Sequence, residues 1–222
     1  MALGGARHRE LAPTLASLWQ QGVTTSDADG GVCEYLVEAT LPSEAHTLGG
    51  APSAVWTKVR LAAHKSLLEL ELEYLAFNKT ATRLPESIFV QFKPAVVAEA
   101  APLGWSLEMF NDSSLVLDPM DVMPSPEGSG GAPHTRCVSG VRWQAQGGKG
   151  APSMWLSSKD VPCICTGTPT PFPTPRNEPP KMADGVSYNI YNNIWNTNYV
   201  LWYPFAAEDA DMKARFSLRF EG

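Results

Sequence analysis

The sequence has little of what marks several common classes of protein. No uninterrupted apolar run approaches the length that crosses a membrane, and the N-terminus lacks the apolar segment of a secretory signal. Basic residues are not in excess, because 17 Lys and Arg stand against 23 Asp and Glu and give a net charge of −6. Four cysteines in 222 residues are too few for a disulfide framework. The composition therefore predicts neither a membrane nor a nucleic-acid partner.

Motifs that carry common enzyme chemistry are also missing. The glycine-rich run at 128–131 leads into a proline rather than a helix that could bind a phosphate, and no Gly-x-Ser-x-Gly elbow is present. His134, Cys137, Cys163 and Cys165 are ligand types that zinc prefers, but Cys-x-Cys is not the usual zinc-knuckle spacing. We interpret these cysteines as buried and unlinked. The chain is expected to hold no metal, no cofactor and no catalytic set.

Short alternating runs separated by turn residues are abundant. Leu68, Leu70 and Leu72 alternate with glutamates, and comparable runs place Ile88, Val90 and Phe92, or Phe216, Leu218 and Phe220, on one face of a strand. With 19 prolines and 18 glycines between them, about ten such segments predict an all-β sandwich of short antiparallel strands joined by proline- and glycine-rich loops. We assign residues 31–222 to this single domain.

Two N-terminal segments do not fit the alternating pattern. Residues 1–30 are poorly patterned and are expected to form a loosely attached leader, or a short helix over Leu11 to Gln20 with Leu15, Leu18 and Trp19 on its apolar side. Residues 42–52 are rich in glycine and serine and are expected to form a loop.

Acidic residues occur in arrangements that resemble catalytic carboxylates. Glu69, Glu71 and Glu73 share one strand face, where like charges repel and stay solvated, so we expect no catalytic role for them. Asp118, Asp121 and Asp160 lie in expected loops, and two of these positions are typical of acidic side chains that cap turns.

The most unusual stretch runs from Ser187 to Trp202 and contains five asparagines, three tyrosines, two tryptophans and no charge. Its alternation predicts a strand with Tyr188 and Ile190 on one face, and Asn189 and Tyr191 on the other. Amides and aromatic rings suit either hydroxyl-rich ligands or buried backbone groups that need partners. The candidates for contact with carbohydrate, or with a neighbouring domain, are Asn192, Asn193, Trp195, Asn198, Trp202, His134 and Asp160.

The order of several motifs is similar to that of a known family. These motifs are Leu70 to Glu73, Asn78-Lys-x-Ala81-x-Arg83-Leu-Pro-Glu86, Asp118-Pro-x-Asp121-Val, His134, Ser158-Lys-Asp160, Tyr191-Asn-Asn-x-Trp195-x-Thr-Asn198 and Arg219-Phe220. Together they resemble the C-terminal region of an uncharacterised group of glycoside hydrolase family 38-like (α-mannosidase-like) proteins, and the asparagine-rich strand is the most specific part. Asn196 and Tyr199 depart mildly from the glycine and phenylalanine usual in that family.

The resemblance implies a catalytic barrel upstream, with zinc and a nucleophilic aspartate, followed by β-sandwich domains. The chain would then be the non-catalytic C-terminal portion of an α-mannosidase-like glycoside hydrolase, or the product of a gene model that lacks its N-terminal part. It would brace the barrel of the same polypeptide and edge its sugar cleft. A free-standing carbohydrate-binding module and a purely structural domain are the alternatives. A bracing domain should expose an apolar patch, with Trp19, Trp195 and Trp202 as candidates.

Overall fold

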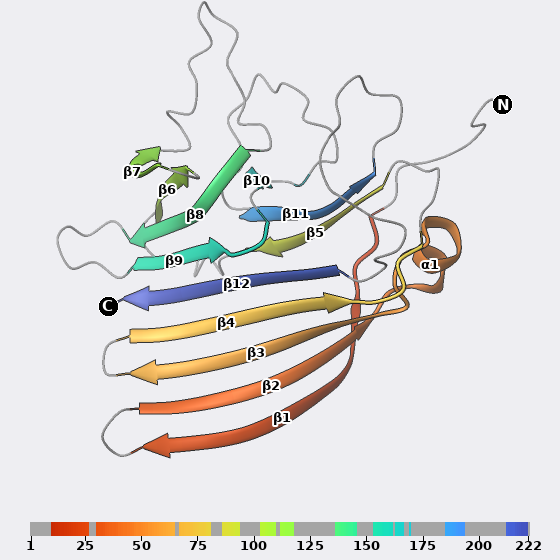
Figure 1. The fold of residues 1–222 in the computed structure, drawn as a ribbon, viewed down its shortest axis with the longest axis horizontal. Helices are drawn as coiled ribbons and strands as arrows, with labels where there is room; N and C mark the ends of the chain where they lie inside the picture. The colour runs from red at the N-terminus through yellow and green to blue at the C-terminus, as the bar shows by residue number, and fades with distance from the viewer. Residues whose placement is uncertain are drawn as a thin grey trace, which may run out of the picture.

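Most of the residues that the structure describes lie in antiparallel β-strands, which confirms the all-β prediction (Figure 1). The computed structural model describes residues 10–26, 30–64, 67–80, 86–93, 103–109, 112–117, 136–145, 153–161, 163–166, 169, 185–193 and 212–221. These hold twelve strands and one helix: β1 (Thr14–Ser26), β2 (Gly30–Thr40), α1 (Ser43–Gly49), β3 (Ala54–His64), β4 (Leu67–Ala76), β5 (Glu86–Phe92), β6 (Leu103–Met109), β7 (Asp112–Leu117), β8 (Arg136–Ala145), β9 (Ser153–Ser158), β10 (Cys163–Thr166), β11 (Val186–Asn193) and β12 (Met212–Glu221).

The larger of the two sheets has the strand order β1-β2-β3-β4-β12-β9-β8. The C-terminal strand β12 inserts between β4 and β9, so residues far apart in the sequence become neighbours. Ten register pairs join β12 to β4, from Met212 opposite Ala76 to Glu221 opposite Leu67. On the far side of β8, β6 and β7 extend the sheet.

A smaller sheet of β10, β11 and β5 branches from the first residues of β8. The hydrophobic core lies between the two sheets, because its buried residues come from β8, β9 and β12 on one side and from β10 and β11 on the other. Phe92 of β5, Tyr188 of β11 and Phe216 of β12 bridge the layers, with ring centroids 5.1 to 6.0 Å apart. Such packing is that of a β-sandwich.

The strand periodicity of β12 is as predicted. Phe216 and Leu218 are buried, whereas Lys213, Arg215 and Arg219 are exposed on the opposite face. The alternation of β11 is interrupted, however, by a bulge between Asn189 and Tyr191. The prediction that Tyr191 lies on the amide face was therefore wrong, because the extra residue brings it to the core side, where it packs with Val55, Ala76 and Met212.

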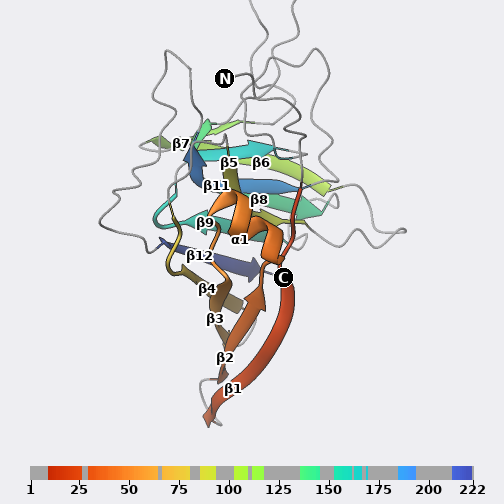
Figure 2. The ribbon, with the colours of Figure 1, turned by 90° about the vertical axis from the view of Figure 1, so that its right-hand side faces the viewer.

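Residues 14–26 of the N-terminal segment form a strand rather than a leader or helix. β1 pairs with β2 from Thr14 opposite Thr40 to Ser26 opposite Gly30, and the ladder has two irregularities. Strands β1 to β3 extend away from the part of the molecule where β5, β8 and β11 gather (Figure 2). Pairing with a neighbouring strand decided the conformation here, and the spacing of Leu15, Leu18 and Trp19, which fits a helix, did not.

The segment 42–52, expected to be a loop, contains the short helix α1. The helix is capped at its C-terminus by Gly50, whose φ of 60° lies in the left-handed region that glycine adopts without strain. The Gly50 N–H donates to the His46 carbonyl at 3.0 Å and closes the last turn. Within the described residues, no helix is long and apolar enough to cross a membrane.

Candidate functional site

The motif residues that follow β4 meet the asparagine-rich strand at one end of the sandwich. We call Lys79, Glu86 and Tyr191 the Lys79 cluster. The Lys79 ammonium donates to the Gly49 carbonyl at 3.0 Å, to the Thr80 carbonyl at 2.8 Å and to Glu86 Oε1 at 2.7 Å. It also lies 4.7 Å from the centre of the Tyr191 ring. The cluster therefore joins the end of α1, the chain after β4, the start of β5 and the end of β11.

The Lys79 cation is fully enclosed, with 0% of its side chain exposed against 15% for Glu86. An ammonium group has three N–H donors, and these three contacts use all of them. The Tyr191 hydroxyl donates to Glu86 Oε1 at 3.4 Å, and burial together with the nearby carboxylate raises the pKa of Tyr191, so the phenol stays protonated. Lys79 has no donor left for a substrate, so its role is to hold segments together.

Local backbone geometry explains how Lys79 reaches this position. Asn78 has φ of 60°, and asparagine is one of the few residues other than glycine that adopt this conformation readily. The chain turns there as it leaves β4, and the next residue enters the interior. The bulge in β11 brings Tyr191 to the same side. The sequence motif Asn78-Lys79 and the strand motif that starts at Tyr191 are thus parts of one contact.

Two of the predicted site residues, Asn192 and Asn193, directly follow Tyr191 of the Lys79 cluster along β11. Asn192 is the register partner of Ser87, and Asn193 is the partner of Glu86, so both lie at the end of the β5–β11 ladder. Trp195, Asn198, Trp202 and His134 lie outside the described residues. The structure therefore brings the start of the asparagine-rich stretch beside the Lys79 cluster.

Several polar groups in the β5–β11 ladder are buried without a hydrogen-bond partner among the described residues. They are Ser87 Oγ, Ser187 Oγ, Tyr188 Oη and Asn189 Oδ1. Register places Ser87, Ser187 and Asn189 on the face of the ladder that points away from the core. A buried polar atom without a partner destabilises the fold, so this outer face is expected to gain partners from elsewhere.

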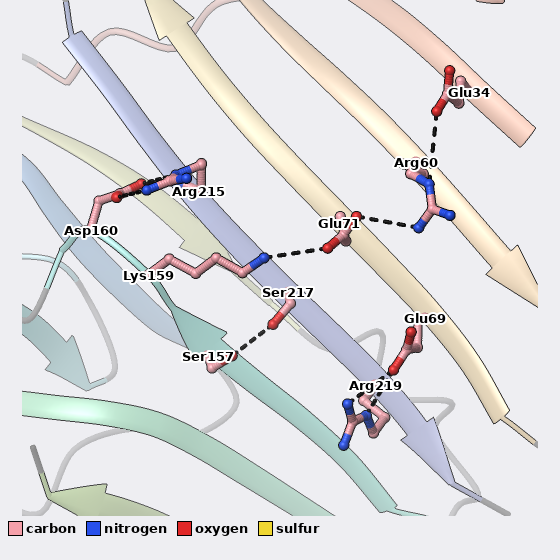
Figure 3. A network of polar contacts seen from close by, with 10 residues as sticks. All are labelled: Glu34, Arg60, Glu69, Glu71, Ser157, Lys159, Asp160, Arg215, Ser217 and Arg219. Atoms are coloured by element: carbon pink, nitrogen blue, oxygen red, sulfur yellow. Dashed lines mark hydrogen bonds and ion pairs between the residues drawn. The ribbon is translucent and has the colours of Figure 1, made fainter.

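A network of charged side chains covers the outer face of the large sheet (Figure 3). Arg60 contacts Glu34 at 3.8 Å and Glu71 at 3.3 Å, and Lys159 reaches Glu71 from the other side at 3.3 Å. The Ser157 and Ser217 hydroxyls lie 2.7 Å apart, between the Lys159–Glu71 and Arg219–Glu69 pairs in Figure 3. Each glutamate of the alternating run on β4 has a cation: Arg219 for Glu69, Arg60 and Lys159 for Glu71, and Lys58 and Lys213 for Glu73.

Asp160 belongs to this network through a bidentate pair with Arg215. Arg215 Nη2 donates to Asp160 Oδ1 at 2.6 Å, and its Nε and backbone N donate to Oδ2 at 2.9 and 2.8 Å. These hydrogen bonds hold the pKa of Asp160 below its usual range despite partial burial. An ionised carboxylate bound in this way suits the anchoring of β12 to the β9–β10 turn better than general acid catalysis.

The sheet edge at β1 exposes apolar side chains. Leu15 is 62% exposed, Leu18 58% and Trp19 45%, and the Trp19 ring stacks on Trp56 with centroids 5.6 Å apart. Leu18 is paired with Val37 and Trp19 with Leu36, so the two side chains lie on opposite faces of the sheet. Trp19, one of the three tryptophans expected at the surface, is exposed, and Leu15 and Leu18 are exposed as well.

Within the described ranges, no group of three His, Cys, Asp or Glu side chains could hold a metal ion. Comparison with known proteins adds no assignment, because no protein-family model, no curated protein and no solved structure matches the chain.

Proposed function

We propose that this chain is the non-catalytic C-terminal β-sandwich portion of an α-mannosidase-like glycoside hydrolase, and that it braces the catalytic barrel through β1. The observation that carries the proposal is the surface of β1, which exposes Leu15, Leu18 and Trp19 on an edge strand without a single charge. Soluble proteins usually protect such edges with charges, and apolar patches commonly mark interfaces.

The distribution of carboxylates supports a non-catalytic role. Glycoside hydrolysis needs two carboxyl groups placed across the scissile bond, one of them able to donate a proton. Asp160 is held ionised by Arg215, and the glutamates of β4 are each paired with cations on an open sheet face. Hydrogen bonds from Arg215 and Lys213 lower the pKa values of Asp160 and Glu73, respectively, so these two carboxylates are poorly suited to act as an acid.

A carbohydrate-binding module is the second candidate, and the exposed Trp19 ring favours it. An aromatic face can pack on the C–H groups of a sugar, and stacking on Trp56 would hold the Trp19 ring in a fixed orientation. In this reading Trp19 replaces, or adds to, the tryptophans of the asparagine-rich stretch. A glycan array with the intact chain and with Trp19→Ala tests it, since loss of every signal in the variant is the expected result.

The bracing role is tested by binding to a zinc-containing α-mannosidase-like barrel that lacks its own sandwich domains. The intact chain should bind the barrel and raise its turnover of aryl α-mannosides, whereas the chain alone should give no turnover with or without zinc. Leu18→Lys should weaken binding, and Leu48→Lys, which changes a comparably exposed leucine on α1, should not. Turnover by the chain alone, or equal binding by the two variants, would disprove the proposal.

A further inference from the structure

Two cysteines far apart in the sequence are direct partners where β10 joins β8. Cys137 of β8 is the register partner of Cys163 of β10, and Cys165 follows two residues later. The side chain of Ile164 is buried in the core, so strand alternation places Cys163 and Cys165 on the opposite face of β10. Register partners share a face, and Cys137 therefore lies on the same face as Cys163.

The spacing of such partners suits a covalent bond. Directly opposite residues in an antiparallel pair have Cα atoms about 4.5–5.5 Å apart. Disulfides form between residues whose Cα atoms lie about 4.4–6.8 Å apart. Cys165 has a different neighbour, since its register partner is Ser187 of β11. The backbone therefore selects Cys163 over Cys165 as the partner of Cys137.

The position of this pair gives the bond a structural consequence. Only two register pairs, Cys163 with Cys137 and Ile164 with Arg136, join β10 to β8. Among the described strands, this short ladder is the pairing that links β11 and β5 to the large sheet. A disulfide at this position would link the two layers of the sandwich covalently, where only two register pairs connect them.

We propose that Cys137 and Cys163 are a redox-active pair that forms an intramolecular disulfide. This proposal differs from the prediction of unlinked thiols, because the register between β8 and β10 is not visible in the sequence. A low-molecular-weight disulfide such as oxidised glutathione is the oxidant. One cysteine thiolate attacks it and releases a glutathione thiolate, and the second attacks the resulting mixed disulfide and releases the other. The two protons lost by the cysteines are taken up by the two glutathione thiolates.

Peptide mapping tests this directly. The reduced chain is incubated with oxidised glutathione, its remaining thiols are alkylated, and it is digested with trypsin without reduction. Cleavage after Arg136, Arg142, Lys159 and Arg176 leaves Cys137 alone in peptide 137–142 and both other cysteines of the site in peptide 160–176. We expect these two peptides to be joined, with Cys33 alkylated, and reduction to separate them.

Variants identify the partner. The link should persist in Cys165→Ser and in the control Cys33→Ser, whose thiol on β2 is free and half-buried, and should vanish in Cys163→Ser. Oxidation should also raise the Tm of the intact chain by roughly 5–15 °C, as a loop of this length predicts, and leave that of Cys137→Ser unchanged. A link from Cys137 to Cys165 or Cys33 would overturn the proposal. Protection of the three thiols by added zinc, reversed by a chelator, would do so as well, as would the absence of any link.

Discussion

Replacement of Lys79 by methionine is the sharpest test of what holds this fold together. Methionine keeps most of the aliphatic stem of lysine and removes the ammonium group. Glu86, only 15% exposed, then loses its cation, and the carbonyls of Gly49 and Thr80 lose their donor. The segments joined by the Lys79 cluster come from α1, the chain after β4, β5 and β11, so the effect should extend beyond one loop.

The expected magnitude follows from the burial of the pair. Removing one partner of a buried ion pair costs about 3–5 kcal/mol, because the other charge stays in a poorly solvated place. A single domain has about 5–15 kcal/mol of stability in total, so Lys79→Met should remove a large part of it. With a urea m-value of about 1–3 kcal/mol/M, the unfolding midpoint should fall by roughly 1–5 M.

Urea unfolding followed by tryptophan fluorescence and by circular dichroism measures this loss. The matched control is Lys58→Met, which removes the same group from an exposed pair with Glu73, where 59% of the lysine side chain is accessible. Exposed pairs contribute about 0–1 kcal/mol, so the midpoint of the control should hardly move.

A double-mutant cycle separates the ion pair from general packing. Glu86→Gln alone should destabilise the chain, because it leaves the enclosed Lys79 cation without a counter-charge. The double variant Lys79→Met/Glu86→Gln should be destabilised by clearly less than the two single changes added together, with a coupling of about 1–3 kcal/mol. If the losses simply add, or if Lys79→Met behaves like Lys58→Met, the reasoning from burial is refuted.

Three further predictions concern stability. Gly185→Ala should destabilise the chain more than Gly22→Ala in thermal or urea unfolding. Both glycines have positive φ, but an added Cβ at Gly185 would lie 2.1 Å from the Phe92 carbonyl oxygen, whereas an added Cβ at Gly22 would meet no atom within 4 Å. The cost of Gly22→Ala is therefore limited to the backbone term of about 1–2 kcal/mol. Asp160→Asn should be less stable than the parent at neutral pH. The difference in stability should shrink as the pH falls below 3.8, the ordinary pKa of an aspartate, because a lowered folded-state pKa gives stability that is lost on protonation. A difference in stability that does not change with pH would contradict this. Phe216→Ala should cost about 3–5 kcal/mol in urea unfolding, since the ring is buried between Phe92 and Tyr188; a loss under 1 kcal/mol would contradict the two-layer core.

Alternating strands that are buried on one face could be predicted from the sequence, because burial imposes a period of two. Leu70 and Leu72 of β4 pack against the core, Phe216 of β12 is buried in it, and both strands lie where expected. Leu68, at the start of β4, is exposed. β1 could not be predicted in the same way. Its apolar side chains point to both faces of an exposed edge, so it has no buried face to impose the period, and Leu15, Leu18 and Trp19 happen to match helical spacing.

The contacts of the candidate site depend on distances that no local pattern encodes. Lys79 donates to a carbonyl 30 residues earlier, and Tyr191 contacts a carboxylate 105 residues before it. A lysine in a polar connection is normally solvated, so its burial could be inferred only after α1, β5 and β11 had been placed together. The bulge that moves Tyr191 to the core side is likewise a property of the β5–β11 ladder, not of β11 alone.

The charges of the outer face also bear on where a partner can bind. Cations and anions alternate across β2, β3, β4 and β12 and neutralise one another within the sheet, so this face offers no strong potential of either sign. β1 differs, because it is uncharged and exposes apolar side chains on both faces. Its ladder with β2 carries two bulges, which twist an edge and make the addition of another strand less favourable. We therefore expect a partner to pack against the side chains of Leu15, Leu18 and Trp19 rather than to extend the sheet.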